Sequence, residues 1–215
     1  MRDARRDDDV ALRLRGVTAG YGDGPAVLDG LDLELEGTGL VQLVGPNGRG
    51  KSTLVELASG YLRPRTGTVE VFGVPAHLPA ARARRRVCRS RVALFPQMTV
   101  RDHLAFGALA RGVPRDDAVA RAERLGLGPW LDSPAGTLST GTARKAWIVL
   151  CTAGSADLLL LDEPFDGLDA DSRDALAREI EAWARDALVV LVSHTLPTGG
   201  APARHVSLDP EELPA

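Results

Sequence analysis

Residues 45–52 have the sequence Gly45-Pro46-Asn47-Gly48-Arg49-Gly50-Lys51-Ser52. This stretch matches the pattern G-x-x-x-x-G-K-[ST], and it lies between an apolar run suited to a buried strand, Leu40–Val44, and apolar residues at helical spacing. Glycines let successive backbone N–H groups turn towards phosphate oxygens, and the start of the helix adds its positive dipole end. A glycine-rich turn without a ligand is the alternative, but the full spacing between a strand and a helix favours a phosphate-binding loop.

The residue types of this loop suit a nucleotide with several phosphates. Lys51 provides a compact positive charge for the outer phosphates, and the Ser52 hydroxyl is a ligand that Mg²⁺ accepts. The sequence therefore predicts that the chain binds a nucleotide together with Mg²⁺. The residues predicted to contact this nucleotide from the loop are Gly45, Pro46, Asn47, Gly48, Arg49, Gly50, Lys51, Ser52 and Thr53.

Two acidic residues follow a second apolar run. Leu158–Leu161 is aliphatic and of strand length, and Asp162 and Glu163 come directly after it. Ligands of parallel α/β sheets bind beyond the carboxyl ends of the strands, so both acids should face the phosphate-binding loop. Asp162 is predicted to hold Mg²⁺ indirectly, and Glu163 to polarise a water for attack on the γ-phosphate. In isolation such a pair is as often a plain turn, but its place after a phosphate-binding core favours catalysis.

His194 follows the last apolar run, Ala187–Val192, in a similar way. A lone histidine at a strand end is more often structural than catalytic. A parallel strand in the same sheet would nevertheless aim His194 at the same nucleotide, which predicts a contact with the γ-phosphate.

The order of the segments predicts an α/β fold. The last third of the chain alternates strand, helix and strand over Leu158–Leu161, Asp171–Arg185 and Ala187–Val192, which implies a parallel sheet covered by helices. The predicted class is a P-loop NTPase core with a mainly parallel sheet, an N-terminal antiparallel β portion and an inserted α-helical subdomain. A single domain over 1–215 is expected, with the helical subdomain at about 99–153.

The middle of the chain contains the segments that are hardest to assign. Ala80–Arg91 is arginine-rich and predicts a solvated helix, and Val92–Phe95 predicts the next strand. From Thr99 to Leu127, apolar residues recur at helical spacing with a break at 112–114, which predicts two helices. A further helix is predicted through Ala143–Cys151.

Composition and charge exclude several classes of protein. A net charge of −3, a pI near 5.8 and 4% aromatic residues argue against general binding to nucleic acid, which uses basic faces and stacked rings. Cys88 and Cys151 have no metal-ligand or disulfide spacing, which fits a reducing compartment. The N-terminus has no secretory signal pattern, and the longest aliphatic runs are too short to cross a bilayer. A cytoplasmic protein is expected.

A third motif, Leu138-Ser139-Thr140-Gly141-Thr142, lies between the two halves of the predicted active site. With the phosphate-binding loop before it and the acidic pair after it, the chain resembles ABC-type ATPases over about residues 12–194. Most members of that family have Leu-Ser-Gly-Gly-Gln at this position, which is called the signature. The resemblance includes Gly167-Leu168-Asp169 as the D-loop, and Tyr21 where the family stacks an aromatic ring on adenine.

The resemblance implies a subunit that hydrolyses ATP with Mg²⁺ and pairs head to tail with a second ABC ATPase subunit, either identical or different. Ser139, Gly141 and Thr142 would then contact the ATP held by the partner's loop, and Asp169 would act in the D-loop. Thr140 and Thr142 replace the family's Gly and Gln, and activity is expected to survive both changes. Integral membrane permease subunits are the other implied partners, which would place the chain peripherally on the inner face of the cell membrane.

The resemblance also implies a glutamine that senses water and Mg²⁺, and two alignments are open for it. In the first, Val92–Phe95 is the preceding strand and Gln97 is this residue, with catalytic and metal-binding roles. In the second, the stretch 94–100 lies several residues beyond that position, the glutamine is absent, and Ser90 lies near its place. The first alignment is preferred because an apolar strand is needed just before the residue.

The predicted function is ATP binding and hydrolysis that energises transport of an unknown substrate through a separately encoded permease. Export is favoured, because subunits that lack a regulatory extension after the position of His194 resemble those of small exporters. Two alternatives stay open. One is a non-transport ABC ATPase that acts on a soluble partner complex, and the other is a regulatory nucleotide-binding module without turnover.

Overall fold

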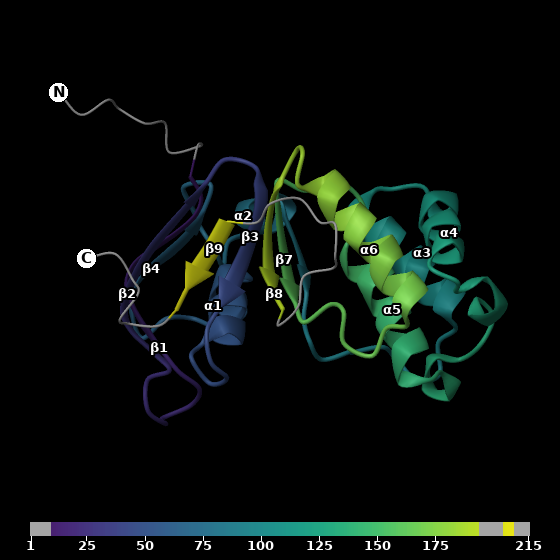
Figure 1. The fold of residues 1–215 in the computed structure, drawn as a ribbon, viewed down its shortest axis with the longest axis horizontal. Helices are drawn as coiled ribbons and strands as arrows, with labels where there is room; N and C mark the ends of the chain where they lie inside the picture. Colours follow the sequence, from purple (N-terminus) through teal and green to yellow (C-terminus); the bar gives the residue numbers. More distant parts are fainter. Residues whose placement is uncertain (1–9, 194–203, 209–215) are drawn as a thin grey trace.

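The computed structural model describes residues 10–193 and 204–208. From one side of the molecule to the other, its layers are an antiparallel sheet, helix α1 (Lys51–Ala58), a parallel sheet and the longer helices (Figure 1). The predicted α/β fold with an N-terminal antiparallel portion and inserted helices is confirmed. In the described part of the chain, no helix combines the length and the apolar character needed to span a bilayer.

The antiparallel sheet is built around one long strand. Its strands, in spatial order, are β2 (Leu28–Glu36), β1 (Val10–Ala19), β4 (Thr66–Val71) and β5 (Val74–Pro75). Alternate leucines of β1 point inward, and Leu12 lies between Leu35 of β2 and Val71 of β4. This inner face packs on α1 and on the parallel sheet in one apolar cluster, so the sheet forms the outer wall of the core.

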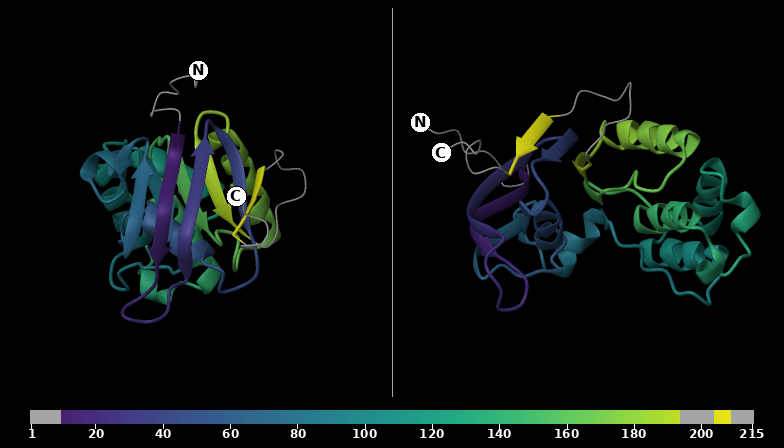
Figure 2. Two further views of the ribbon diagram at one scale, coloured as in Figure 1. Left: turned by 90° about the vertical axis from the view of Figure 1, so that its left-hand side faces the viewer. Right: turned by 60° about the horizontal axis from the view of Figure 1, so that its bottom comes forward.

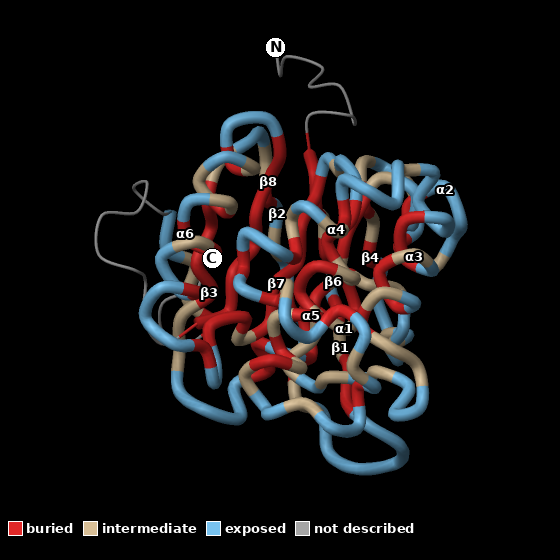
Figure 3. The backbone as a smooth tube through the Cα atoms, turned by 90° about the vertical axis from the view of Figure 1, so that its right-hand side faces the viewer, coloured by how far each residue is buried: buried red, intermediate tan, exposed pale blue. Residues whose placement is uncertain are grey.

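The parallel sheet carries the centre of the molecule. Its strands, in spatial order, are β6 (Arg85–Cys88), β7 (Leu158–Asp162), β8 (Leu188–Val192), β3 (Gly39–Val44) and β9 (Arg204–Ser207). Every residue of β7 and β8 is buried (Figure 3). Helix α1 packs on one face of these strands, and α5 (Thr140–Cys151) and α6 (Ala170–Trp183) pack on the other. The carboxyl ends of β3, β7 and β8 therefore open at one edge of a rigid platform.

Three helices pack together on the far side of the molecule from the antiparallel sheet (Figure 2, right). They are α3 (Val100–Arg111), α4 (Arg115–Arg124) and α5 (Thr140–Cys151), with short 3₁₀ turns at Gly128–Trp130 and Ala135–Thr137. Thr99 caps α3 by accepting the backbone N–H of Asp102, and Gly112 ends it at φ 65°. The predicted pair of helices with a break at 112–114 is confirmed.

Two predictions for the middle of the chain are wrong. The segment Ala80–Arg91 is not one helix, because helix α2 (Pro79–Ala83) is followed at once by strand β6. Val92–Phe95 is not a strand. This segment leads from β6 to α3, and the Phe95 N–H donates to His103 Nε2 of α3 at 2.9 Å rather than to a neighbouring strand.

Candidate functional site

The phosphate-binding loop joins β3 to α1 and needs glycine for its shape. Gly48 and Gly50 have backbone φ values of 82° and 89°, which residues other than glycine rarely adopt. A Cβ atom at Gly50 would lie 2.5 Å from Leu28 Cδ2. Gly50 is also the N-cap of α1 and forms no side-chain cap, so the first N–H groups of the helix face the loop and are available to an anion.

Lys51 and Ser52 stand at the start of α1 and point to two different partners. Lys51 Nζ donates to the carbonyl oxygens of Gly45 at 2.7 Å and Pro46 at 3.1 Å, so its ammonium group lies inside the loop. Ser52 Oγ donates to Asp162 Oδ1 at 3.2 Å. The hydroxyl and the carboxylate that the sequence assigns to Mg²⁺ therefore meet, although they are far apart in the chain.

These two oxygen ligands fit Mg²⁺, which prefers carboxylate and hydroxyl oxygens and keeps several waters. Asp162 is 3% exposed, so its charge is shielded from bulk water. Within residues 10–193 and 204–208, no group of three or more His, Cys, Asp or Glu side chains is arranged to hold a metal ion. Ser52 and Asp162 are the residues present that would hold Mg²⁺, as the sequence predicts.

A cavity of about 440 Å³ lies over the loop and contains most of the predicted nucleotide site. It is lined by Tyr21, Val27, Asn47, Gly48, Gly50, Lys51, Ser52, Thr53, Glu163, Asp166 and Val192. Tyr21 comes from the loop after β1, and its hydroxyl accepts a hydrogen bond from Thr53 Oγ1 at 3.4 Å. Asp166 was not predicted as a site residue. It lies in the turn directly after the acidic motif, where its N–H donates to the Glu163 carbonyl at 3.3 Å.

Glu163 holds a backbone conformation that is rare for its residue type. Its φ of 46° lies in the left-handed region, and its N–H donates to the Val192 carbonyl at 2.8 Å. A non-glycine residue there costs about 1–2 kcal/mol. Strained backbone of this kind concentrates at functional sites. The left-handed conformation turns the chain at the end of β7, and Glu163, the predicted catalytic residue, lines the cavity.

The signature motif lies at the start of α5, outside this cavity. Ser139 Oγ caps α5 by accepting the Thr142 N–H at 3.2 Å, and the two hydroxyl oxygens are 2.8 Å apart. A Cβ atom at Gly141 would lie 2.5 Å from the Gly167 carbonyl oxygen, so glycine allows the signature to pack on the D-loop. In the described part of the chain, no residue of 138–142 lines the nucleotide cavity.

Asp169, at the end of the D-loop, caps the next helix. Its Oδ1 accepts the Ser172 N–H at 2.8 Å, and Lys145 Nζ lies 3.4 Å from Oδ2. Hydrogen bonds from Ser172, with a smaller contribution from the Lys145 charge, lower the pKa of Asp169 to about 2. The carboxylate therefore stays ionised at neutral pH.

Gln97 is not brought to the cavity. It is exposed in a turn before α3, and the neighbouring Pro96 carbonyl accepts the Gly136 N–H at 2.9 Å. The prediction of a strand just before Gln97 is wrong. Strand β6 ends at Cys88, and Ser90 is the polar residue that closely follows this strand. This order agrees with the second alignment. His194, the other predicted catalytic residue, lies outside the described residues.

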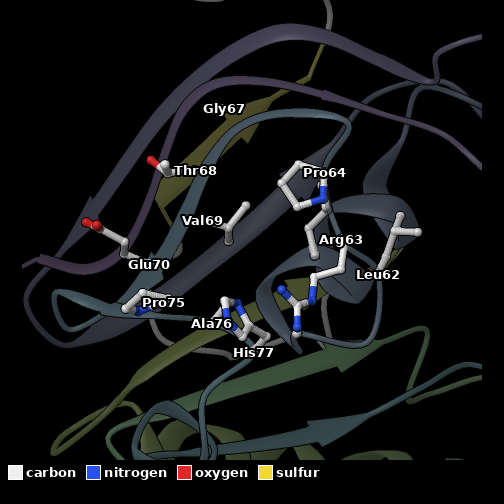
Figure 4. Close-up of a pocket in the computed structure, with 12 residues that line it drawn as sticks. Leu62, Arg63, Pro64, Gly67, Thr68, Val69, Glu70, Pro75, Ala76 and His77 are labelled. Atoms are coloured by element: carbon white, nitrogen blue, oxygen red, sulfur yellow. The ribbon is translucent and has the colours of Figure 1, made fainter.

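A second cavity, of about 370 Å³, lies between the end of α1 and strands β4 and β5 (Figure 4). Its wall combines apolar residues such as Leu62 and Val69 with the charged side chains of Arg63 and Glu70. Among the described residues, none of those predicted for nucleotide or metal lines this second cavity.

Comparison with known proteins identifies the family. The family model for ABC transporters matches residues 28–166. A taurine import ATP-binding protein of Chromobacterium violaceum is 34% identical over 87% of this chain and 74% of its own length. ABC transporter A family member 4 of Dictyostelium discoideum is 32% identical over 81% of this chain, which spans 11% of that protein. A solved ATP-binding subunit of an ABC transporter superposes with a TM-score of 0.76, at 28% identity over 86% of this chain and 80% of that one. The resemblance inferred from the motifs is thus confirmed: the chain belongs to the ABC transporter family and is one of its ATPase domains.

Proposed function

We propose that this domain hydrolyses ATP at the cavity over its phosphate-binding loop, and that the energy drives a solute through a membrane permease. The observation that carries the proposal is the contact of Ser52 Oγ with Asp162 Oδ1 at 3.2 Å. This contact joins the phosphate-binding loop to the acidic pair, and Lys51, Ser52 and Glu163 line the same cavity.

Each of these residues has a separate role in the proposed reaction. Lys51 exchanges the Gly45 and Pro46 carbonyls for the outer phosphate oxygens, while the N–H groups at the start of α1 bind the inner ones. Ser52 and Asp162 would hold Mg²⁺, which neutralises phosphate charge when bound. Glu163 accepts a hydrogen bond from the attacking water and orients it, which is the role that its place at the cavity wall supports.

A second ATPase domain completes each site in this proposal. Ser139, Gly141 and the start of α5 form an anion-binding helix terminus, and these residues do not line the chain's own nucleotide cavity. A head-to-tail pair would bring this terminus to the partner's nucleotide. Thr142 stands beside Ser139 at this terminus, since the two hydroxyl oxygens are 2.8 Å apart.

The permease is proposed from the family and from the surface of α3. Phe106 and Leu109 are one turn apart on this helix and are 61% and 82% exposed, which suits a contact with another protein. Export remains a prediction, and the taurine relative is an importer by its name. Reconstitution with the permease in vesicles would show the direction. ATP added outside energises only the transporters whose ATPase domains face outwards, so ATP-dependent uptake of labelled solute supports export, and ATP-dependent release of solute from the lumen contradicts it.

The catalytic assignment is tested by Glu163→Gln. The variant should bind Mg²⁺-ATP with an affinity close to that of the parent chain, release almost no phosphate, and accumulate as an ATP-bound dimer in size-exclusion chromatography. Asp174→Asn is the matched control, because it makes the same change at an exposed position of α6. Phosphate release by Glu163→Gln at the control's rate would refute the assignment.

The head-to-tail pairing is tested with mixed dimers. Ser139→Arg in one chain should block hydrolysis at the other chain's loop and leave its own loop able to turn over when the partner is unaltered. A mixed population with unchanged total phosphate release would contradict the arrangement. His194→Ala, measured in the same assay, tests the predicted contact of His194 with the γ-phosphate.

A further inference from the structure

The loop that carries Tyr21 is short and exposed. It leaves β1 at Ala19 and enters β2 at Leu28, and the Val27 N–H closes its base by donating to the Ala19 carbonyl at 2.7 Å. Within it, Gly24 donates its N–H to the Tyr21 carbonyl at 3.3 Å. Tyr21 is 54% exposed at the rim of the nucleotide cavity. The side chain thus stands on a tight turn whose tip is surrounded by solvent.

Arg65 reaches this loop from the other side of β1. It lies just before β4, and its own backbone is fixed by an N–H bond to the Thr18 carbonyl at 2.8 Å. Its Nη2 donates to two carbonyls of the loop, Gly22 at 3.0 Å and Gly24 at 2.6 Å. One guanidinium nitrogen therefore bridges both ends of the turn that follows Tyr21.

The loop is shaped to receive this guanidinium group. A Cβ atom at Gly20 would lie 2.6 Å from the Pro25 carbonyl oxygen and 3.1 Å from Arg65 Nη2. Among the described residues, Arg65 forms no ion pair with a carboxylate. Its charge is therefore directed at main-chain oxygens, and a hydrogen bond with a charged donor is stronger than a neutral one.

We propose that Arg65 is a positioning residue that holds the Tyr21 loop in the conformation that stacks on the adenine of ATP. The inference rests on the proposed function and on the contact of Tyr21 with adenine that the resemblance to the family implies. A loop that is already ordered loses less conformational entropy when ATP binds. Arg65 would therefore strengthen the binding of ATP, which has a base, but not that of a polyphosphate without one. The phosphate contacts made by Lys51 and the hydrolysis step would stay unchanged.

The test compares two ligands and two side chains in the full chain. Arg65→Met removes the donors and keeps an apolar stem, and the dissociation constants for Mg²⁺-ATP and Mg²⁺-tripolyphosphate are measured by calorimetry. ATP should bind roughly 3- to 10-fold more weakly, as expected for the loss of charged hydrogen bonds at an exposed site. The affinity for tripolyphosphate and the kcat at saturating ATP should not change, and Arg65→Lys, which keeps one charged donor group, should restore part of the loss.

Arg63→Met is the matched control. Arg63 is an exposed arginine two positions away that faces the second cavity (Figure 4). This variant should bind ATP as the parent chain does. Equal weakening of ATP and tripolyphosphate by Arg65→Met would overturn the inference, because a general loss of structure moves both.

A double-mutant cycle separates this inference from the proposed function. Tyr21→Ala should weaken ATP binding by itself, and adding Arg65→Met to it should change the affinity by less than about twofold, because coupled residues are not additive. If Tyr21→Ala weakens ATP binding and Arg65→Met does not, the role of Arg65 is refuted and the nucleotide site stands. If Tyr21→Ala has no effect, the contact of Tyr21 with adenine fails, and the positioning role fails with it.

Discussion

Glu163 should make the protein less stable than glycine would at the same position. Its φ of 46° is costly for a residue with a Cβ atom and costs glycine nothing. Glu163→Gly and Glu163→Ala both remove the carboxylate, so their difference isolates the backbone. We expect the glycine variant to be more stable than the alanine variant by about 1 kcal/mol. In a chain of this size, that difference corresponds to about 2–4 °C in Tm.

Asp166 gives the matched comparison, because it lies in the same turn and its φ is not positive. There, alanine should be more stable than glycine by about 0.4–1 kcal/mol, since glycine has more freedom to lose on folding. Urea unfolding of all four variants without nucleotide gives the free energies. Greater stability of Glu163→Ala than of Glu163→Gly would refute the claim that the backbone at this site is strained. Both Glu163 variants should also lose phosphate release, which would show strain and catalysis at one residue.

Three further predictions concern stability. Arg86→Met should lower the free energy of unfolding by about 1–3 kcal/mol in urea, because this buried guanidinium bonds to backbone carbonyls; Arg101→Met, which breaks an exposed ion pair, should leave the midpoint nearly unchanged. His103→Leu should cost about 1–3 kcal/mol in the same assay, because the Phe95 N–H loses its acceptor. Asp169→Asn should remove a pH-dependent part of stability: the pKa of Asp169 is lowered from 3.8 to about 2 on folding, so its contribution is complete above about pH 4 and lost as the pH falls towards 2. Thermal scans over this range check it, and a constant difference between variant and parent would contradict it.

The core of the fold could be predicted because it depends on local patterns with clear physical causes. The loop at 45–52 requires a strand before it and a helix after it, and β3 and α1 lie there. The aliphatic run before Asp162 is a strand buried on both faces. Since parallel strands end at one edge of a sheet, the meeting of Ser52 with Asp162 followed from the order of the motifs alone.

Contacts that depend on tertiary structure could not be found in this way. Asp166 lines the cavity only because the strained turn at Glu163 folds the chain back. Arg65 meets the Tyr21 loop because β4 pairs with β1 in a register that sets Thr66 opposite Thr18. No local pattern signals such a neighbour, since arginine after proline in a short connection also suits plain exposure to solvent.

Strand β6 shows most clearly why the middle of the chain was misassigned. Successive residues of a strand point to opposite faces of the sheet, so Arg85 bonds to the Ser59 carbonyl at the end of α1, and Arg86 to the Ala153 carbonyl beyond α5. The carboxyl end of a helix presents free carbonyls and negative dipole charge, which suit a cation.

Both arginines are thereby buried in the core. Burial, with the nearby charges of Arg82 and Arg111, lowers the pKa of Arg85 to about 10, so it remains charged at neutral pH. An arginine run indicates a solvated helix when only its polarity is considered. Here the partners are the ends of two helices that begin far away in the sequence, and a strand is the element that reaches both.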